Sequence, residues 1–180
     1  MEHITLFSIP WEQVLCKHLL PFFSLKELFI LRIVDKQFLQ LVHCYFSLVF
    51  RINTAPFSSQ LSSKAFDILT RNNFSLKELV LCNSRDWLCD GTLVPVLQNN
   101  NGLTTIDISH CQALSNASLY TVGAHCRKVK KLIIRGCVWA SGAGLISLVS
   151  NQLPLEHMDL SGCWDLTDED VITLTKHSPK

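Results

Sequence analysis

Three cysteines, Cys111, Cys137 and Cys163, recur at intervals of 26 residues in the second half of the chain. A thiolate can ligate a metal or act as a nucleophile, and His110 and His125 each directly precede a cysteine. Zinc needs several nitrogen or sulfur ligands within about 2.0–2.3 Å of one ion, whereas neighbouring side chains on a strand diverge. The chain also has no C-x-x-C pair. We therefore expect packing cysteines, with no metal and no cofactor.

Catalysis by the same residue types would need a nucleophile, a base and an orienting group that converge in a pocket. The adjacent pairs His110–Cys111 and Cys89–Asp90 supply the types without a pattern that brings them together. A Gly-rich phosphate loop, H-E-x-x-H and G-x-S-x-G are all absent from the sequence. The sequence therefore favours a non-catalytic protein.

The interval of 26 residues belongs to a repeating unit. The alternation L-x-L occurs four times and predicts short strands with one buried face, at Leu79/Leu81, Ile106/Ile108, Leu132/Ile134 and Met158/Leu160. A polar or small pair suited to a helix N-cap follows each one, and then apolar residues at helical spacing, at Leu93/Leu97, Leu119/Val122, Leu145/Leu148 and Val171/Leu174. A single strand and helix cannot bury their apolar sides alone, so the units must stack.

The pattern L-x-x-L-x-L-x-x-C-x-x-L-[ST]-[DN]-x-x-L resembles the cysteine-containing leucine-rich repeat. The resemblance implies an α/β fold, a right-handed solenoid with a parallel sheet on its concave face and helices on its convex face. Four such units occupy residues 75–180. Residues 49–74 resemble a degenerate unit, with Ile52 in its strand and Phe66 and Leu69 in its helix. Because Ser84 replaces the cysteine in the first unit, the position suits a small packed side chain better than a ligand.

Composition narrows the class further. The chain has 180 residues, a hydrophobic fraction of 48% and a formal net charge of +1, so nothing in its overall charge indicates nucleic-acid binding. No apolar run reaches the roughly 18 residues of a membrane span. The opening "MEHITLFSIPWEQ" lacks the basic segment and cleavage site of a signal peptide. We expect reduced cysteines and a location in the cytoplasm or nucleus, without membrane or nucleic-acid partners.

Residues 1–48 lack the repeat, and their pattern predicts three short helices. Pro10 can open the first helix and Pro21 can end it. Ser24–Glu27 reads "SLKE", a capping box for a second helix with Leu28, Leu31 and Val34 on its apolar face. Asp35 can cap a third helix, "KQFLQLVHCYF".

The same segment resembles an F-box, through "IPWEQVL" at its start, "SLKEL" in the middle and "LRIVDKQFLQL" at its end. The combination resembles the family of F-box and leucine-rich-repeat proteins. That resemblance implies a substrate adaptor of a Skp–cullin–F-box ubiquitin ligase, in which the F-box docks a Skp-type adaptor and through it a cullin. The expected docking residues are Ile9, Pro10, Trp11, Val14, Leu15, Leu19 and Leu28.

Two alternatives remain open at this point. The apolar residues of the first helix could pack only against the first repeat. The protein would then be a repeat-only scaffold for protein binding, with the F-box-like helices as its cap. Co-purification of a Skp-type adaptor separates the two hypotheses.

A protein substrate of such an adaptor would bind the concave face. Residues that flank the buried L-x-L pairs point to that face, and same-column residues on adjacent strands lie about 5 Å apart. The expected contact residues are Glu78, Val80, Thr105, Asp107, Lys131, Ile133, Arg135, His157 and Asp159. Arg135 could instead form only a local ion pair with Asp107 or Asp159.

Two further features each have two interpretations. Trp87, Trp139 and Trp164 either cover the rim of the core or form binding hot spots. The basic run at 127–131, "RKVKK", is either a solvated loop or a site for an acidic partner. Pro95 implies that its helix starts after Asp90 or is distorted.

The fourth unit ends the chain without a recognisable cap, although a solenoid normally needs one. We therefore expect further repeats in a longer form, with Leu166, Val171 and Leu174 near an exposed apolar end. A short form of this kind would dock the adaptor but capture substrate poorly.

Overall fold

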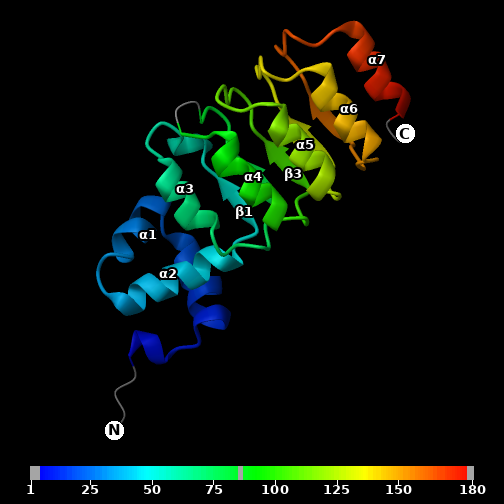
Figure 1. Ribbon diagram of the computed structural model, residues 1–180. Helices are drawn as coiled ribbons and strands as arrows, with labels where there is room; N and C mark the ends of the chain where they lie inside the picture. Colours follow the sequence, from blue (N-terminus) through cyan, green and yellow to red (C-terminus); the bar gives the residue numbers. More distant parts are fainter. Residues whose placement is uncertain (1–4, 85–86, 178–180) are drawn as a thin grey trace. The chain divides into compact units, whose positions relative to one another are not determined.

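The computed structural model describes residues 5–84 and 87–177, and these form two compact units. Unit 1 comprises residues up to Val49 together with Ile68–Asn73, and unit 2 comprises Phe50–Asp67 together with the chain from Phe74 onward. Unit 1 is helical, and unit 2 alternates strands with helices (Figure 1).

Unit 1 contains the short helices η1 (Leu6–Ser8), η2 (Trp11–Leu19) and η3 (Leu20–Phe22), followed by α1 (Leu25–Leu31) and α2 (Lys36–Leu48). The capping box at Ser24 is confirmed, because its Oγ accepts from the Glu27 N–H and the Glu27 carboxylate accepts from the Ser24 N–H at 2.7 Å. The Asp35 cap is also confirmed, since Asp35 Oδ1 accepts from the Phe38 N–H at 2.8 Å. The helices therefore begin where the side-chain caps predict.

The first helix differs from the prediction in its winding. η2 is a π-helix, a form that is rare over nine residues because its hydrogen bonds reach one residue further than in an α-helix. Pro10 lies just before η2, η2 ends at Leu19 close to Pro21 as predicted, and Pro21 itself lies in the next short helix, η3. The apolar side of η2 and η3 buries Leu15, Cys16 and Leu20.

The core of unit 1 is completed by α1 and α2, which bury Leu28, Leu41, Val42 and Phe46. The prediction that Val34 lies on the apolar face of the second helix is wrong. α1 ends at Leu31, so Val34 falls in the following turn and is exposed.

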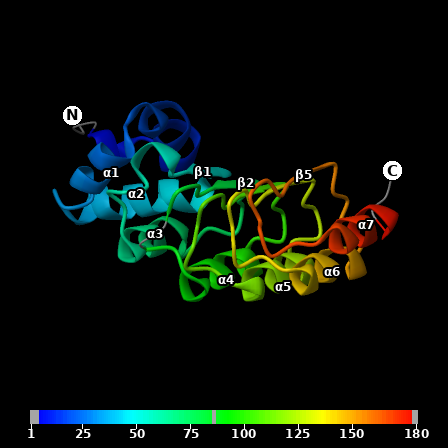
Figure 2. The ribbon, with the colours of Figure 1, turned by 90° about the horizontal axis from the view of Figure 1, so that it is seen from above.

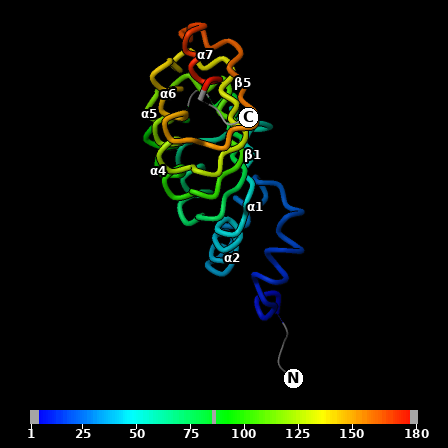
Figure 3. The backbone as a smooth tube through the Cα atoms, turned by 90° about the vertical axis from the view of Figure 1, so that its right-hand side faces the viewer, coloured from blue at the N-terminus to red at the C-terminus, as the bar shows by residue number. Residues whose placement is uncertain are grey.

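Unit 2 is built on five parallel strands in the spatial order β1–β5: β1 (Arg51–Asn53), β2 (Glu78–Val80), β3 (Thr105–Asp107), β4 (Lys131–Ile133) and β5 (His157–Asp159). The intervening helices are η4 (Ala55–Phe57), α3 (Ser63–Thr70, shared by the two units), α4 (Asp90–Asn99), α5 (Asn116–His125) and α6 (Gly142–Ser150), and α7 (Asp168–His177) follows β5. Strands line one side of the stack and helices α4 to α7 the other (Figure 2), and successive coils of the backbone repeat the same path (Figure 3). The predicted mixed α/β fold with a parallel sheet is confirmed.

The repeating apolar positions form the interior of unit 2. Adjacent strands pair residue for residue at the predicted spacing, so that Ile52, Leu79, Ile106, Leu132 and Met158 occupy one column. The first four of these side chains are buried and Met158 is half-buried. Phe66 and Leu69 of α3 are buried as well, which confirms the elements predicted for the degenerate unit.

The turn after each strand uses a left-handed backbone at the same repeat position. Asn83, His110, Gly136 and Gly162 have φ angles of 63°, 59°, 65° and 74°. The N–H groups of the first three donate to backbone carbonyls of the next repeat at 2.7–2.8 Å. Glycine adopts this conformation without strain, and Asn and His are among the non-glycine residues that adopt it most often. A stack of near-identical turns therefore extends the sheet's hydrogen bonding beyond the three-residue strands.

The α4 helix begins at Asp90 and contains Pro95 in its interior. The alternative that this helix starts late is therefore wrong. Proline has no N–H, so one helical hydrogen bond is lost at that position.

Candidate protein-binding surfaces

The recurring cysteines are buried hydrogen-bond donors. Cys111, Cys137 and Cys163 donate from Sγ to a backbone carbonyl of the preceding repeat at 3.1–3.2 Å. Burial raises the pKa of Cys111 and of Cys137 to about 12, so both are protonated thiols at neutral pH. Nowhere in the described residues do three or more His, Cys, Asp or Glu side chains gather in an arrangement that could hold a metal ion. The packing interpretation of these cysteines is confirmed.

In the first repeat, the position of these cysteines is occupied by Ser84, which is fully buried. Among the residues that the structure describes, its hydroxyl oxygen has no hydrogen-bond partner, unlike the three thiols that follow it in the stack. A buried hydroxyl without a partner is more costly than a buried thiol, because oxygen loses stronger hydrogen bonds to water. The first repeat therefore contains a polar defect that the later repeats avoid.

The residues predicted to dock an adaptor divide into two groups. Pro10, Val14 and Leu19 are exposed, while Ile9 and Trp11 are half-buried. Leu15 and Leu28, in contrast, lie in the core of unit 1 with exposed fractions of 2% and 3%. Their assignment to a surface site is wrong, because their helices turn these two side chains inward against α2.

Trp11 is partly engaged within unit 1. Its ring makes an edge contact with Phe7 at a centroid distance of 6.3 Å, and Phe7 contacts Phe38 of α2 at 4.9 Å. Aromatic pairs in this range stabilise one another. This cluster holds the start of η2 against α2 and leaves Trp11 half-buried.

Several exposed apolar side chains of unit 1 were missed by the sequence reasoning. Phe22 is 84% exposed, Ile33 80%, Val34 60% and Ile30 53%. They lie in η3 and at the end of α1, together with the turn that follows it. The signal in the sequence was that "LFILRIV" holds more apolar residues than one helix face can bury. We call Val14, Leu19, Phe22, Ile30, Ile33 and Val34 the exposed apolar set of unit 1.

The strand face of unit 2 is formed by residues that flank the buried columns. Lys131, Arg135 and His157 are exposed on it. The remaining predicted contact residues are half-buried, namely Glu78, Val80, Thr105, Asp107, Ile133 and Asp159. Since the L-x-L side chains point inward, the predicted orientation of the strands is confirmed.

Two carboxylates of the strand face, on β3 and on the terminal strand β5, are already hydrogen-bonded. Asp159 Oδ2 accepts from Arg135 at 2.6 Å and 3.2 Å, and its Oδ1 accepts from the Ser161 N–H at 3.0 Å. Hydrogen bonding by the Ser161 side chain, then by Arg135 and by the Ser161 N–H, holds the pKa of Asp159 well below its usual range. Asp107 accepts from both the N–H and the hydroxyl of Ser109, at 3.0 Å and 2.6 Å.

Of the two carboxylates that could pair with Arg135, the structure shows the pair with Asp159. At the edge of the face where the strands begin, Arg51 pairs with Glu78 at 3.2 Å. In the same column Lys131 and His157 are neighbours in register and both are exposed. The strand face therefore offers a partner two kinds of charged site, namely ion pairs that are already formed and the solvated basic groups of Lys131 and His157.

The three tryptophans differ in their surroundings. Trp87 donates from Nε1 to the Ser58 carbonyl at 2.8 Å, and Trp139 donates to the Cys111 carbonyl at 2.7 Å. Both connect neighbouring coils, as the rim-covering interpretation predicts. Trp164 is 83% exposed in the turn after β5. It therefore remains the candidate for a binding contact.

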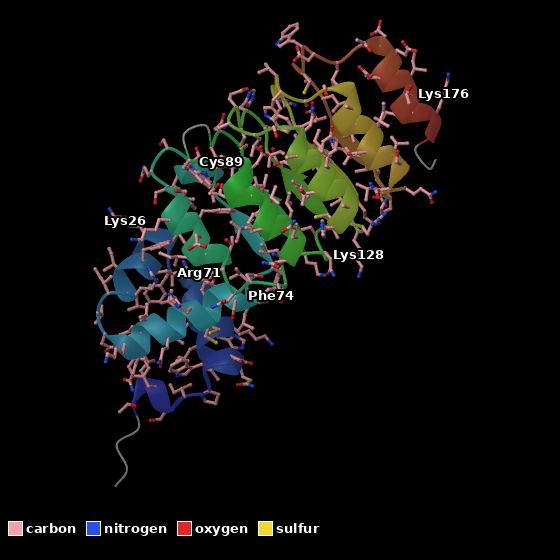
Figure 4. All side chains as sticks on the ribbon, viewed as in Figure 1. Lys26, Arg71, Phe74, Cys89, Lys128 and Lys176 are labelled. Atoms are coloured by element: carbon pink, nitrogen blue, oxygen red, sulfur yellow. The ribbon has the colours of Figure 1, made fainter. Side chains whose placement is uncertain are left out.

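The basic run at 127–131 is largely solvated. Lys130 pairs with Glu156 at 2.6 Å, and Arg127 donates to the Asn151 carbonyl at 2.9 Å. Lys128 projects from the edge of the repeat stack (Figure 4). Two basic groups of the run, those of Arg127 and Lys130, are thus already bonded within the repeat stack.

Comparison with solved structures defines the class of fold. The tropomodulin C-terminal domain of Caenorhabditis elegans superposes with a TM-score of 0.56 at 9% identity, over 86% of this chain and 91% of that domain. A leiomodin-1 domain described as actin-binding site 2 gives a TM-score of 0.53 at 12% identity, over 72% of this chain and 79% of that one. These neighbours share a leucine-rich-repeat-like arrangement of helices on a parallel sheet.

Sequence comparison then indicates a family relationship. F-box/LRR-repeat protein 15 of Mus musculus and its counterpart in Rattus norvegicus are each 32% identical to the chain over 123 residues, or 68% of this chain. The chain is related to the F-box/LRR-repeat proteins, as its motifs predicted. The match spans 41% of the length of these curated relatives. No protein-family model matches the chain.

The structure also bears on membrane insertion. Within residues 5–84 and 87–177, no helix has the length and apolar content needed to cross a bilayer.

Proposed function

We propose that the protein is a non-catalytic substrate adaptor of a Skp–cullin–F-box ubiquitin ligase. In this proposal unit 1 is the F-box and docks a Skp-type adaptor, which links it to a cullin. The strand face of unit 2 binds a protein substrate. The family relationship supports the assignment at the level of the class.

One observation carries the docking half of the proposal: unit 1 exposes large apolar side chains that its own core does not use. Phe22 and Ile33 each expose more than three quarters of their surface. Exposed apolar side chains on a small helical unit are a common feature of protein-binding surfaces. The proposed docking residues are the exposed apolar set together with Ile9, Pro10 and the half-buried Trp11.

The substrate half rests on the mixed character of the strand face. Val80 and Ile133 offer half-buried apolar surface, beside the Arg135–Asp159 pair and the exposed Lys131. The sheet already restricts the side chains on its strands. Binding a partner therefore costs little further conformational entropy at this surface. Trp164 adds an exposed aromatic group next to this face, of the type enriched at hot spots.

A binding experiment tests the docking half. The full chain is co-expressed with a Skp-type adaptor, and the amount of adaptor that co-purifies is measured. The double variant Val14→Glu/Leu19→Glu should lose most of the adaptor. The matched control is Ile146→Glu on α6, because Ile146 and Val14 have similar exposed fractions of 47% and 40%.

Circular dichroism of both variants checks that each is folded. If the folded double variant retains the adaptor, or if the wild-type chain never binds it, the docking proposal fails. The alternative would then be a repeat scaffold whose helical unit serves only as a cap.

A second measurement tests the strand face. Ubiquitin conjugates that co-purify with the chain from proteasome-inhibited cells are compared between wild type and the variant Lys131→Glu/Arg135→Glu. We expect fewer conjugates with unchanged adaptor binding. Tyr120→Glu on α5 provides the control for an exposed residue on the helical side. Equal losses in the two variants would contradict substrate binding by the strands.

A further inference from the structure

Unit 1 brings two thiols together from distant parts of its sequence. Cys16 lies in η2 and Cys44 in α2, and these two helices pack against each other. Their Sγ atoms are 4.0 Å apart, although the residues are 28 positions apart in the chain. Cys16 is only 5% exposed, whereas Cys44 is half-buried.

We propose that Cys16 and Cys44 are a site of reversible oxidation, at which glutathione disulfide converts the two thiols into an intramolecular disulfide between η2 and α2. A disulfide bond is about 2.0 Å long, so the sulfur atoms must approach by about 2 Å in total. Each cysteine side chain turns about its Cα–Cβ bond, so rotation of both side chains can move the sulfurs toward each other by about 1 Å each. The packed helices already hold the two sulfurs 4.0 Å apart before any reaction takes place.

The chemistry proceeds by two thiol–disulfide exchanges. The Cys44 thiolate attacks glutathione disulfide, which forms a mixed disulfide and releases one glutathione thiolate. The Cys16 thiolate then attacks the Cys44 sulfur, which forms the protein disulfide and releases the second glutathione. The two protein thiols lose two electrons in total and glutathione disulfide gains them. The two protons end on the released glutathione thiols.

Accessibility sets the order of these steps. Cys44 reacts first because its side chain is partly open to solvent, while Cys16 is enclosed by the core. Burial raises the pKa of the Cys16 thiol, and the neighbouring Cys44 and Glu12 raise it further. Few Cys16 thiolates exist at neutral pH, so the second exchange is slow and is favoured mainly by proximity.

The consequence is a covalent link inside unit 1. A disulfide that closes a loop of this length restricts the unfolded chain and therefore raises the thermal midpoint of the unit. η2 also carries Val14 and Leu19, so oxidation would restrain a helix that contributes to the proposed docking surface. The inference itself rests on the thiol geometry and holds whether or not that surface binds an adaptor.

The test equilibrates the folded full-length chain with a mixture of oxidised and reduced glutathione. Remaining thiols are blocked with a maleimide, and the products are located by peptide mapping with mass spectrometry. We expect a peptide pair linked through Cys16 and Cys44, which dithiothreitol reverses. Exposed Cys89 (Figure 4) reports that the oxidant is active, and buried Cys126 reports on a thiol that burial protects.

Single variants make the result decisive. Cys16→Ser should trap glutathione on Cys44, and Cys44→Ala should leave Cys16 as a free thiol. Oxidation should raise the melting midpoint of the wild-type chain but not that of Cys44→Ala. The proposal is overturned if wild-type Cys44 keeps glutathione while Cys16 stays free. It is also overturned if both remain reduced where Cys89 is modified, or if the same link forms equally well in urea-unfolded protein.

Discussion

The two units of this protein use their apolar residues in opposite ways. In the inner repeats of unit 2, the repeating positions Leu103, Ile106, Ile108 and Leu119 are all fully buried. In unit 1, Phe22 and Ile33 are among the most exposed apolar side chains of the described chain, although Leu28 and Leu41 in the same unit are buried. In these inner repeats each apolar position meets the same kind of neighbour one coil away on either side, so its burial follows from the stack. A short helical unit has no such neighbour, and its surplus apolar surface remains available to a partner.

The largest effect is expected where a charge enters the stacked interior. Cys137→Arg should destabilise unit 2 by about 3–5 kcal/mol or unfold it, because an unpaired buried charge has no compensating partner. Cys137 is fully buried and donates to the Ile108 carbonyl. Urea unfolding monitored by circular dichroism measures the loss. Val138→Arg, at a position that is 46% exposed, is the control and should change stability by about 0.5 kcal/mol or less.

The next effect separates the two kinds of apolar position within unit 1. Leu41→Ala should cost about 2–5 kcal/mol, because Leu41 is fully buried and the substitution leaves a cavity. Ile33→Ala should cost no more than about 0.5 kcal/mol, because Ile33 is 80% exposed. Hydrogen exchange of the α2 amides reports the stability of this unit. Equal costs at the two positions would mean that Ile33 belongs to the core and not to a binding surface.

A smaller effect tests the defect at the start of the cysteine column. Ser84→Cys should stabilise the chain by about 1 kcal/mol, because it replaces a buried hydroxyl that has no hydrogen-bond partner among the described residues. Ser84→Ala should be close to neutral, whereas Cys137→Ala should cost about 1 kcal/mol through lost volume. Denaturant midpoints of the three variants measure these differences. If Ser84→Ala costs more than Cys137→Ala, the serine hydroxyl makes a bond that stabilises the repeat.

The smallest effect concerns the Arg135–Asp159 pair on the strand face. The folded state lowers the pKa of Asp159, so its stabilising contribution is fully present above the unfolded value of about 3.9, declines gradually below it and is lost only as pH falls through the lower folded value. Asp159→Asn should therefore cost under about 1 kcal/mol at pH 7, since Arg135 is largely exposed. Unfolding measured at pH 7 and at pH 3 should show this cost shrinking in acid. A double-mutant cycle with Arg135→Gln isolates the pair, and a coupling indistinguishable from zero at pH 7 would mean that the pair does not stabilise the fold.

The periodic features could be predicted from the sequence because each repeat buries the same apolar positions in the same local geometry. The L-x-L alternation places Leu79 and Ile106 inward whatever the rest of the chain does, and the spacing of 26 or 27 residues sets the register between strands. Helix starts were readable for a similar reason. Ser24 and Asp35 bond to N–H groups three residues away, so their capping depends only on neighbouring sequence.

Surface assignments in unit 1 were partly wrong because burial there depends on contacts that no period encodes. Leu15 and Val14 are adjacent and similar in chemistry, yet one lies in the core and the other is exposed. The π-helical winding of η2 changes the angle between successive side chains, so an α-helical reading of the same residues misassigns its faces.

The sequence alone therefore determined the repeat, its strands, its helix caps and the buried role of its cysteines. All of these arise from interactions over a few residues or from one period repeated along the chain. Only the tertiary structure decided that Asp159 rather than Asp107 pairs with Arg135, and that Trp139 bonds across to the Cys111 carbonyl. It also decided that Cys16 lies beside Cys44. Such contacts join residues more than 20 positions apart, and their distances depend on how whole elements pack.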